Sequence, residues 1–147
     1  MRAIKLIALQ FFFLSPAFAH AASASPVLGE RALREECSAF SEAGMWDCLD
    51  KKARASEKAL RQAQEKAASA LSKWDEDDKY INQSKAKLSA SNDAFAKYRD
   101  AQCAFASSLG GGAIGAALDL RRFACVAELN NRRAAQLRDA LSDLPLK

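Results

Sequence analysis

The chain has 147 residues, of which 27% are charged, and a formal net charge of +4 at pH 7. This length suits one domain of ordinary size, and the charges are mixed along the chain instead of forming the basic block expected of a nucleic-acid-binding protein. The one histidine, His20, lies near the N-terminus. The rest of the chain therefore has no histidine to act as general base for a serine or cysteine nucleophile.

Residues 1–19 have the features of a secretory signal peptide. Arg2 and Lys5 form a short basic region, residues 6–14 are an apolar run, and residues 17–19 read Ala-Phe-Ala, the small-x-small pattern of a cleavage site. The apolar run is shorter than the roughly 20 residues of a membrane-spanning helix, so we expect no stable membrane insertion after cleavage. Cleavage removes two of the 22 basic residues and leaves 20 against 18 acidic ones, a net charge near +2.

Residues 20–29 are small and polar and predict a flexible tail, and signal cleavage as late as residue 24 would fall within it. From Glu30 onward, alanine, leucine, lysine, arginine and glutamate dominate, and these residues favour helix. We therefore expect a single helical domain over residues 30–147. Its first element is predicted to be a short helix over about residues 30–40.

Three longer segments, about residues 42–74, 79–109 and 115–144, repeat apolar residues at intervals of three and four, the spacing of an amphipathic helix. An aromatic stripe at this spacing is typical of a protein core, so we expect all three stripes to be buried. The predicted stripes are Met45, Leu49, Ala53, Leu60, Ala63, Ala67, Leu71 and Trp74; Ile81, Leu88, Phe95, Tyr98, Phe105 and Leu109; and Leu120, Phe123, Ala127, Ala134, Leu137, Leu141 and Leu144.

Two breaks separate these segments. Residues 75–78, Asp-Glu-Asp-Asp, predict a charged turn whose aspartates cap the next helix. Gly110, Gly111 and Gly112 predict the end of the second helix, because glycine readily adopts the left-handed conformation found there. This loop follows a helix and lacks the Gly-Lys-Ser/Thr ending of a phosphate-binding loop. The predicted fold is thus an all-α antiparallel bundle of three long helices and a short N-terminal helix.

The four cysteines, Cys37, Cys48, Cys103 and Cys125, all follow the predicted leader. An even number of cysteines in an exported chain predicts two disulfides. With one histidine and no Cys-x-x-Cys pair, the sequence supports neither a metal site nor a thioredoxin-like redox site. We expect no metal-binding, cofactor-binding or catalytic residues.

Helix geometry favours one pairing of these cysteines. Cys103 and Cys125 lie roughly 10 and 15 Å from the glycine turn if each helix rises about 1.5 Å per residue, so a bond between them would tie the hairpin together. Cys37 and Cys48 would lie about 16 Å apart in one continuous helix, whereas a disulfide requires Cα atoms within about 7 Å. If bonded, they require a turn between them, and Ser41 is a suitable N-cap there. The other two connectivities remain open.

Several of these features together resemble the LprI-type lysozyme-inhibitor domain, over about residues 37–138: the export signal, the Cys-x10-Cys pair, the segment YRDAQC, the glycine loop, and Cys125 followed by AELNNRRAAQL. The family commonly places an aromatic residue three positions before its Tyr/Phe-Arg-Asp, where this chain has Phe95. It also has Leu-Thr-x-x-Arg after the last cysteine. Here Arg133 matches that arginine and Asn130 replaces the threonine.

The resemblance implies a periplasmic or secreted protein that binds a lysozyme tightly, protects peptidoglycan, needs no cofactor and is not an enzyme. An alternative is a structural or adaptor protein of the periplasm or envelope with another protein partner. Carboxylates can form a glycosidase pair, but the clustered carboxylates of residues 75–78 are more typical of a solvated turn.

We predict structural roles for the family-motif residues Phe95, Tyr98, Arg99, Asp100 and Arg133. Arg99 lies one helical turn before Cys103 and should reach the facing helix, where a half-buried arginine needs a polar partner. Gly110, Gly111 and Gly112 are the candidate partner-binding residues. Their turn is small, and a disulfide behind it would limit the entropy lost on binding.

Overall fold

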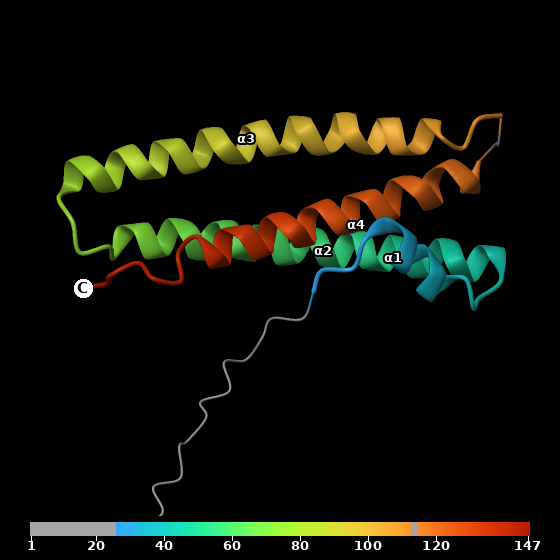
Figure 1. Cartoon of the computed structure of the whole chain (residues 1–147), viewed down its shortest axis with the longest axis horizontal. Helices are drawn as coiled ribbons and strands as arrows, with labels where there is room; N and C mark the ends of the chain where they lie inside the picture. Colours follow the sequence, from blue (N-terminus) through green and yellow to red (C-terminus); the bar gives the residue numbers. More distant parts are fainter. Residues whose placement is uncertain (1–25, 113–114) are drawn as a thin grey trace, which may run out of the picture.

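The computed structural model describes residues 26–112 and 115–147, which form four α-helices (Figure 1). The helices are α1 (Glu30–Cys37), α2 (Glu42–Ser72), α3 (Asp78–Ser108) and α4 (Ala116–Asp139). Within these residues the only β-type pairing is an isolated bridge, so the predicted all-α fold is confirmed. The predicted signal peptide and the first part of the predicted tail lie outside the described residues. None of the described helices is long and apolar enough to cross a bilayer.

Helix α4 is the central element, because its contacts with the other three helices are together the most extensive of any helix. Its contact with α2 is the most extensive, and that with α3 comes next. Helices α2 and α3 are long and run antiparallel, with α4 crossing between them in projection and α1 lying against α2 and α4 near one end (Figure 1). Helix α3 has much less contact with α2 than with α4.

The helix ends follow the sequence closely, with two corrections. Ser41 is the N-cap of α2, where its Oγ accepts a hydrogen bond from the Gly44 amide at 3.4 Å, as expected. Asp77 occupies the N-cap position of α3, but its side chain makes no capping hydrogen bond, so the predicted side-chain cap is wrong. Helix α4 ends at Asp139 instead of continuing to Leu144. Pro145 disfavours helical conformation at Leu144, the residue before it, so the helix cannot continue as far as Leu144.

Buried side chains form three clusters that confirm the predicted stripes of α2 and α4. Most of their members are small, so the helices approach closely and the core depends on shape as much as on large apolar groups. The clusters consist of Leu33, Cys37, Leu49, Ala124 and Ala127; Leu60, Ala63, Ala67, Ala134 and Leu137; and Cys103, Ala106 and Cys125.

The predicted stripe of α3 is confirmed in its first half, where Leu88 and Phe95 pack against the second core cluster, and is wrong in its second half. Ile81 is buried, but Tyr98, Phe105 and Leu109 are 55%, 57% and 58% exposed. The contact between α3 and α4 instead uses Cys103 and Ala106, which lie on a neighbouring face of the helix. Because α2 contributes little to covering α3, Tyr98, Phe105 and Leu109 stay more than half exposed.

The bundle has two ends of different construction. At the disulfide end lie the α1–α2 loop, the α3–α4 turn and both disulfides. At the acidic end, the α2–α3 turn lies beside the C-terminus (Figure 1). There Trp74 and Leu146 form an antiparallel bridge, and the Asp75 amide donates a hydrogen bond to the Pro145 carbonyl at 2.9 Å.

Candidate functional site

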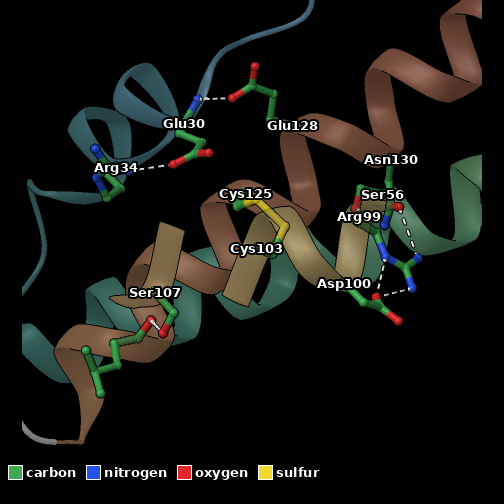
Figure 2. The surroundings of a disulfide bond; sticks show 11 residues. Glu30, Arg34, Ser56, Arg99, Asp100, Cys103, Ser107, Cys125, Glu128 and Asn130 are labelled. Carbon is green, nitrogen blue, oxygen red and sulfur yellow. Dashed lines mark hydrogen bonds and ion pairs between the residues drawn. A yellow bond between two sulfur atoms is a disulfide. The ribbon is translucent and has the colours of Figure 1, made fainter. Parts of the chain in front are cut away.

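Both predicted disulfides are present. Cys37 and Cys48 have Cα atoms 5.8 Å apart, and Cys103 and Cys125 have Cα atoms 5.5 Å apart. The first links the end of α1 to the first turns of α2, because the chain reverses between them as the distance argument required. The second links α3 to α4 behind the glycine turn (Figure 2). No cysteine is left free.

The glycine turn is anchored at its base. Ser107 Oγ donates a hydrogen bond to the Leu118 carbonyl at 3.1 Å, which joins the last turn of α3 to the first turn of α4 (Figure 2). A Cβ at Gly110 would lie 2.5 Å from Leu118 Cδ2, so the two helices approach too closely here for a larger residue without movement.

The next two glycines face open space. Gly111 has φ +60°, a left-handed conformation that favours glycine, as predicted for the end of the helix. A Cβ added at Gly111 or Gly112 would meet no atom of the described residues within 4 Å. The predicted partner-binding residues therefore divide into one glycine that holds the turn together and two that are exposed at its tip.

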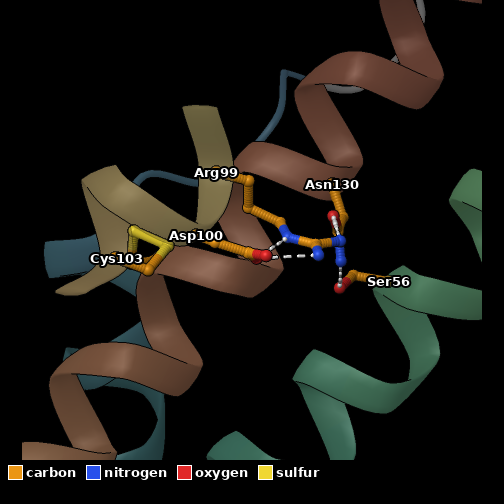
Figure 3. Close-up of polar contacts among 6 residues, drawn as sticks. Ser56, Arg99, Asp100, Cys103 and Asn130 are labelled. Atoms are coloured by element: carbon orange, nitrogen blue, oxygen red, sulfur yellow. Dashed lines mark hydrogen bonds and ion pairs between the residues drawn. A yellow bond between two sulfur atoms is a disulfide. The ribbon is translucent and has the colours of Figure 1, made fainter. Parts of the chain in front are cut away.

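A buried polar network near the Cys103–Cys125 disulfide connects α2, α3 and α4 (Figure 3). Arg99 Nη1 on α3 donates to Asn130 Oδ1 on α4 at 3.3 Å, and Asn130 Nδ2 donates to Ser56 Oγ on α2 at 3.1 Å. Asn130 is 0% and Ser56 is 1% exposed. Buried polar groups are stable only when hydrogen-bonded, so this network fixes the relative positions of the three helices.

Asp100 completes the surroundings of Arg99 from the solvent side. Arg99 Nε and Nη2 donate to Asp100 Oδ1 at 3.1 and 2.9 Å (Figure 3). The Asp100 side chain is 68% exposed, whereas that of Arg99 is 23% exposed. An ion pair with so exposed a partner contributes little by itself. Arg99 thus reaches the facing helix as predicted, and its contact with Asn130 is the more important one.

Two members of this network were not predicted as site residues. Ser56 lies between Ala53 and Leu60, at a step of three and then four, so it occupies a position of the α2 stripe where an apolar residue would be expected. Asn130 appeared only as a replacement for the family's threonine. A polar residue that interrupts an otherwise regular apolar stripe was the available signal for both.

Arg133 forms a second contact between α4 and α3. Its Nη2 donates to Ser91 Oγ at 2.8 Å and to Asn92 Oδ1 at 3.3 Å, and its guanidinium lies 5.9 Å from the centre of the Phe95 ring. Phe95 is half-buried and packs against the second core cluster. These two motif residues therefore lie together, whereas the Tyr98 side chain points away from the core.

The acidic turn is exposed and has no inward-facing carboxylate. All four residues from Asp75 to Asp78 are exposed. One side-chain hydrogen bond lies within the turn, where the Asp77 amide donates to Glu76 Oε1 at 3.2 Å. Across residues 26–112 and 115–147, no group of three or more histidine, cysteine or carboxylate side chains is arranged to hold a metal ion.

The family relationship follows from a comparison of the sequence with family models. A family model described as lysozyme inhibitor LprI matches residues 35–137. The chain belongs to the LprI family. The matched range begins two residues before Cys37 and ends at Leu137, the last buried residue of α4. It includes both disulfides, the buried polar network and the glycine turn, and it leaves out the C-terminal segment that pairs with Trp74.

No curated protein and no solved structure matched the chain. We therefore infer the roles of individual residues from their contacts. Arg99 on α3 contacts α4, and Arg133 on α4 contacts α3. Among the described residues, no contact gives Gly111 or Gly112 a structural role.

Proposed function

We propose that this protein is an exported, non-catalytic inhibitor that binds a lysozyme-like muramidase and thereby protects peptidoglycan. The match to the lysozyme-inhibitor family over residues 35–137 carries the proposal. Its expected location is the periplasm or the extracellular space. The signal-peptide pattern of residues 1–19 supports this location, and so do two disulfides, because such bonds persist in oxidising compartments.

We assign the contact with the enzyme to the tip of the glycine turn. Within the part of the chain that the structure describes, Gly111 and Gly112 have open space around them, so they can enter a cleft with little steric hindrance. The Cys103–Cys125 bond and the hydrogen bond from Ser107 to Leu118 hold the loop from behind. A segment that is anchored at its base loses less entropy on binding than an unanchored one, and this favours affinity.

The first test separates binding of the enzyme from coating of its substrate. The oxidised protein, purified without residues 1–24, is mixed with a lysozyme, and two rates are measured: lysis of insoluble peptidoglycan and hydrolysis of a short soluble chitooligosaccharide. We expect both rates to fall, with a saturable complex in isothermal titration calorimetry. Full activity on both substrates at a large excess of protein would reject the proposal. Protection of the insoluble substrate alone would indicate that the protein binds peptidoglycan instead.

The second test concerns the glycine turn. Gly112→Trp adds an indole at the tip, and it avoids Gly111, where any side chain would be strained by the positive φ. Ala86→Trp adds the same group at an exposed position of α3 away from the turn and serves as the control. We expect Gly112→Trp to weaken inhibition at least about tenfold, or about 1.4 kcal/mol, and the control to inhibit normally. Equal inhibition by both variants would place the contact elsewhere.

The acidic turn is the competing surface. Changing Asp75, Asp77 and Asp78 to Asn and Glu76 to Gln removes its charge without changing its shape. Exposed charges at the rim of an interface act mainly on the association rate and make it salt-dependent. We expect the neutralised variant to inhibit with unchanged affinity. A complete loss of inhibition in this variant, with Gly112→Trp unaffected, would reverse the assignment.

A further inference from the structure

The disulfide end carries a long segment without charge. Residues 101–118 contain no aspartate, glutamate, lysine, arginine or histidine, in a chain of which 27% is charged. The segment begins after Asp100 and stops before Asp119, so it includes the last turns of α3, the glycine turn and the start of α4. A stretch of this length without charge, on a surface otherwise rich in charge, marks one end of the molecule as different from the rest.

Exposed apolar side chains lie along the same part of α3. Tyr98, Ala101, Phe105 and Leu109 follow one another at steps of three and four, so they lie on one face of the helix, and all four are exposed. We call these four residues the α3 ridge. From Tyr98 to Leu109 it is about 16 Å long at 1.5 Å per residue. Its last member directly precedes Gly110, so the ridge and the glycine turn form one continuous surface.

This grouping requires an explanation. Single exposed apolar residues are normal, but contiguous exposed patches mark interaction sites. Of the seven large hydrophobic residues that are exposed in the described chain, three belong to the ridge and a fourth, Tyr80, lies on the same helix. The C-terminal segment pairs with Trp74 at the acidic end, and α1 packs against α2 and α4, so neither covers the ridge.

A second copy of the chain is a poor occupant. Continued toward the N-terminus, the same face of α3 reaches Ser91 and Lys87, so the apolar seam extends over only about two heptads, whereas helix pairing through a seam requires three or four. A short row of exposed apolar side chains instead fits a concave site.

We infer that the α3 ridge, together with the glycine turn, occupies the substrate cleft of the muramidase. This inference rests on the proposed function and names the surface that performs it. Ligand clefts are concave and largely apolar, with a few polar groups that fix orientation. The rings of Tyr98 and Phe105 offer flat apolar faces such as a sugar ring presents, and the Tyr98 hydroxyl offers a hydrogen-bonding group.

The lack of charge is what suits this surface to a cleft. Burying an unpaired charge is expensive, whereas burying apolar groups is favourable. Residues 101–118, which include all of the ridge except Tyr98, contain nothing that would have to be desolvated as an ion. The charged residues Glu30, Glu128, Arg132 and Arg133 line the pocket beside Tyr98 at the other end of the ridge. Inhibition through the ridge should therefore be competitive with a soluble oligosaccharide, and its affinity should change less than about threefold between 50 and 500 mM salt, because screening acts on charges.

The test uses two ridge variants and one matched control. Phe105→Ser and Leu109→Ser replace side chains that are already more than half exposed, and Tyr80→Ser makes the same kind of change at a 46% exposed position near the acidic end of α3. We expect each ridge variant to raise the inhibition constant about tenfold or more and Tyr80→Ser to leave it unchanged. Circular dichroism melts of all three variants check that the fold is retained.

A second measurement needs no variant. Hydrogen exchange of the unaltered protein, with and without the lysozyme, should show added protection over residues 98–112 and none over residues 75–80. If the protein inhibits but the ridge variants inhibit equally well and residues 98–112 gain no protection, the ridge assignment is wrong and the proposed function stands. If the protein does not inhibit hydrolysis of the soluble substrate, the proposed function fails and the inference fails with it. A dimer that Phe105→Ser converts to a monomer would show that a second copy covers the ridge, and would overturn the inference.

Discussion

The two ends of the bundle are held together by different means. At the disulfide end, two covalent bonds tie α1 to α2 and α3 to α4, in addition to a core cluster flanked by Met45 and Phe123. Toward the acidic end, the second core cluster is flanked by Leu88, Phe95 and Leu141, and backbone hydrogen bonds join the C-terminus to the α2–α3 turn.

This difference suggests why the exposed apolar side chains gather where they do. An end that is crosslinked does not depend on burying every large apolar group, so Phe105 and Leu109 can remain exposed without loss of the fold. The other end has no crosslink and depends on its apolar core and on the backbone hydrogen bonds of the C-terminal segment. The comparison therefore predicts that changes at the disulfide end act through the crosslinks and close packing, and that changes at the C-terminus have small and local effects.

Reduction of both disulfides should have the largest effect. The bonds span 11 and 22 residues, and loops of this length are each worth about 3 kcal/mol in the chain-entropy account. Their combined loss of about 6 kcal/mol is comparable to the whole stability of many domains. Urea unfolding of oxidised and reduced protein measures the difference. Equal midpoints would show that the crosslinks do not hold this end together.

Arg99→Ala should rank second, because Asn130 Oδ1 is buried and would lose its donor from α3. Leaving a buried acceptor unsatisfied costs about 1–3 kcal/mol. Asp100→Ala is the control, since it removes only an exposed partner and should cost less than about 1 kcal/mol. Thermal melts of both variants decide the order. Normal stability with lost inhibition in Arg99→Ala would make Arg99 a contact residue instead.

Gly110→Ala tests the close approach at the base of the turn. The added methyl would meet Leu118 Cδ2 and the Ser107 carbonyl, so we expect a loss of about 1 kcal/mol, the lower part of the range for overpacking, because the Leu118 side chain can move. Gly112→Ala faces open space and should change the free energy of unfolding by less than about 0.5 kcal/mol. Denaturant unfolding of the two variants separates the effect of the close contact at Gly110 from the general effect of replacing a glycine by alanine.

Deletion of residues 145–147 should have the smallest effect. It removes the hydrogen bond from the Asp75 amide to Pro145 and that from the Lys147 amide to Lys73, at 2.9 and 2.8 Å. Both lie at the surface, so we expect a loss of about 0.5–1 kcal/mol, faster hydrogen exchange at Asp75 and unchanged inhibition. A loss as large as that of a disulfide would contradict the distinction drawn between the two ends.

The helices and disulfides were predictable because they depend on local patterns. Spacing of three and four places the α2 and α4 stripes, and distance limits favour the observed cysteine pairing over the alternatives. The family-motif arginines were also recognisable, and Arg99 reaches α4 as expected.

The errors occurred where a pattern depends on neighbours. Periodicity shows that Tyr98, Phe105 and Leu109 share a face of α3, but not whether another helix covers that face. Ser56 was missed because a polar residue on an apolar stripe looks like an interruption, until Asn130 is seen to supply its partner. Asp77 has a suitable side chain for a cap, but its hydrogen-bonding geometry depends on the turn as a whole.

The order of the disulfides along the chain has a consequence for maturation. Each cysteine pairs with its next neighbour in sequence, the first with the second and the third with the fourth. A chain that enters an oxidising compartment with its N-terminus leading presents Cys37 and Cys48 together, well before Cys103 appears. Oxidation in order of emergence then gives the native pairs directly, without the thiol–disulfide exchange that corrects crossed pairs. We therefore expect this connectivity to form with an oxidase alone, without a disulfide isomerase.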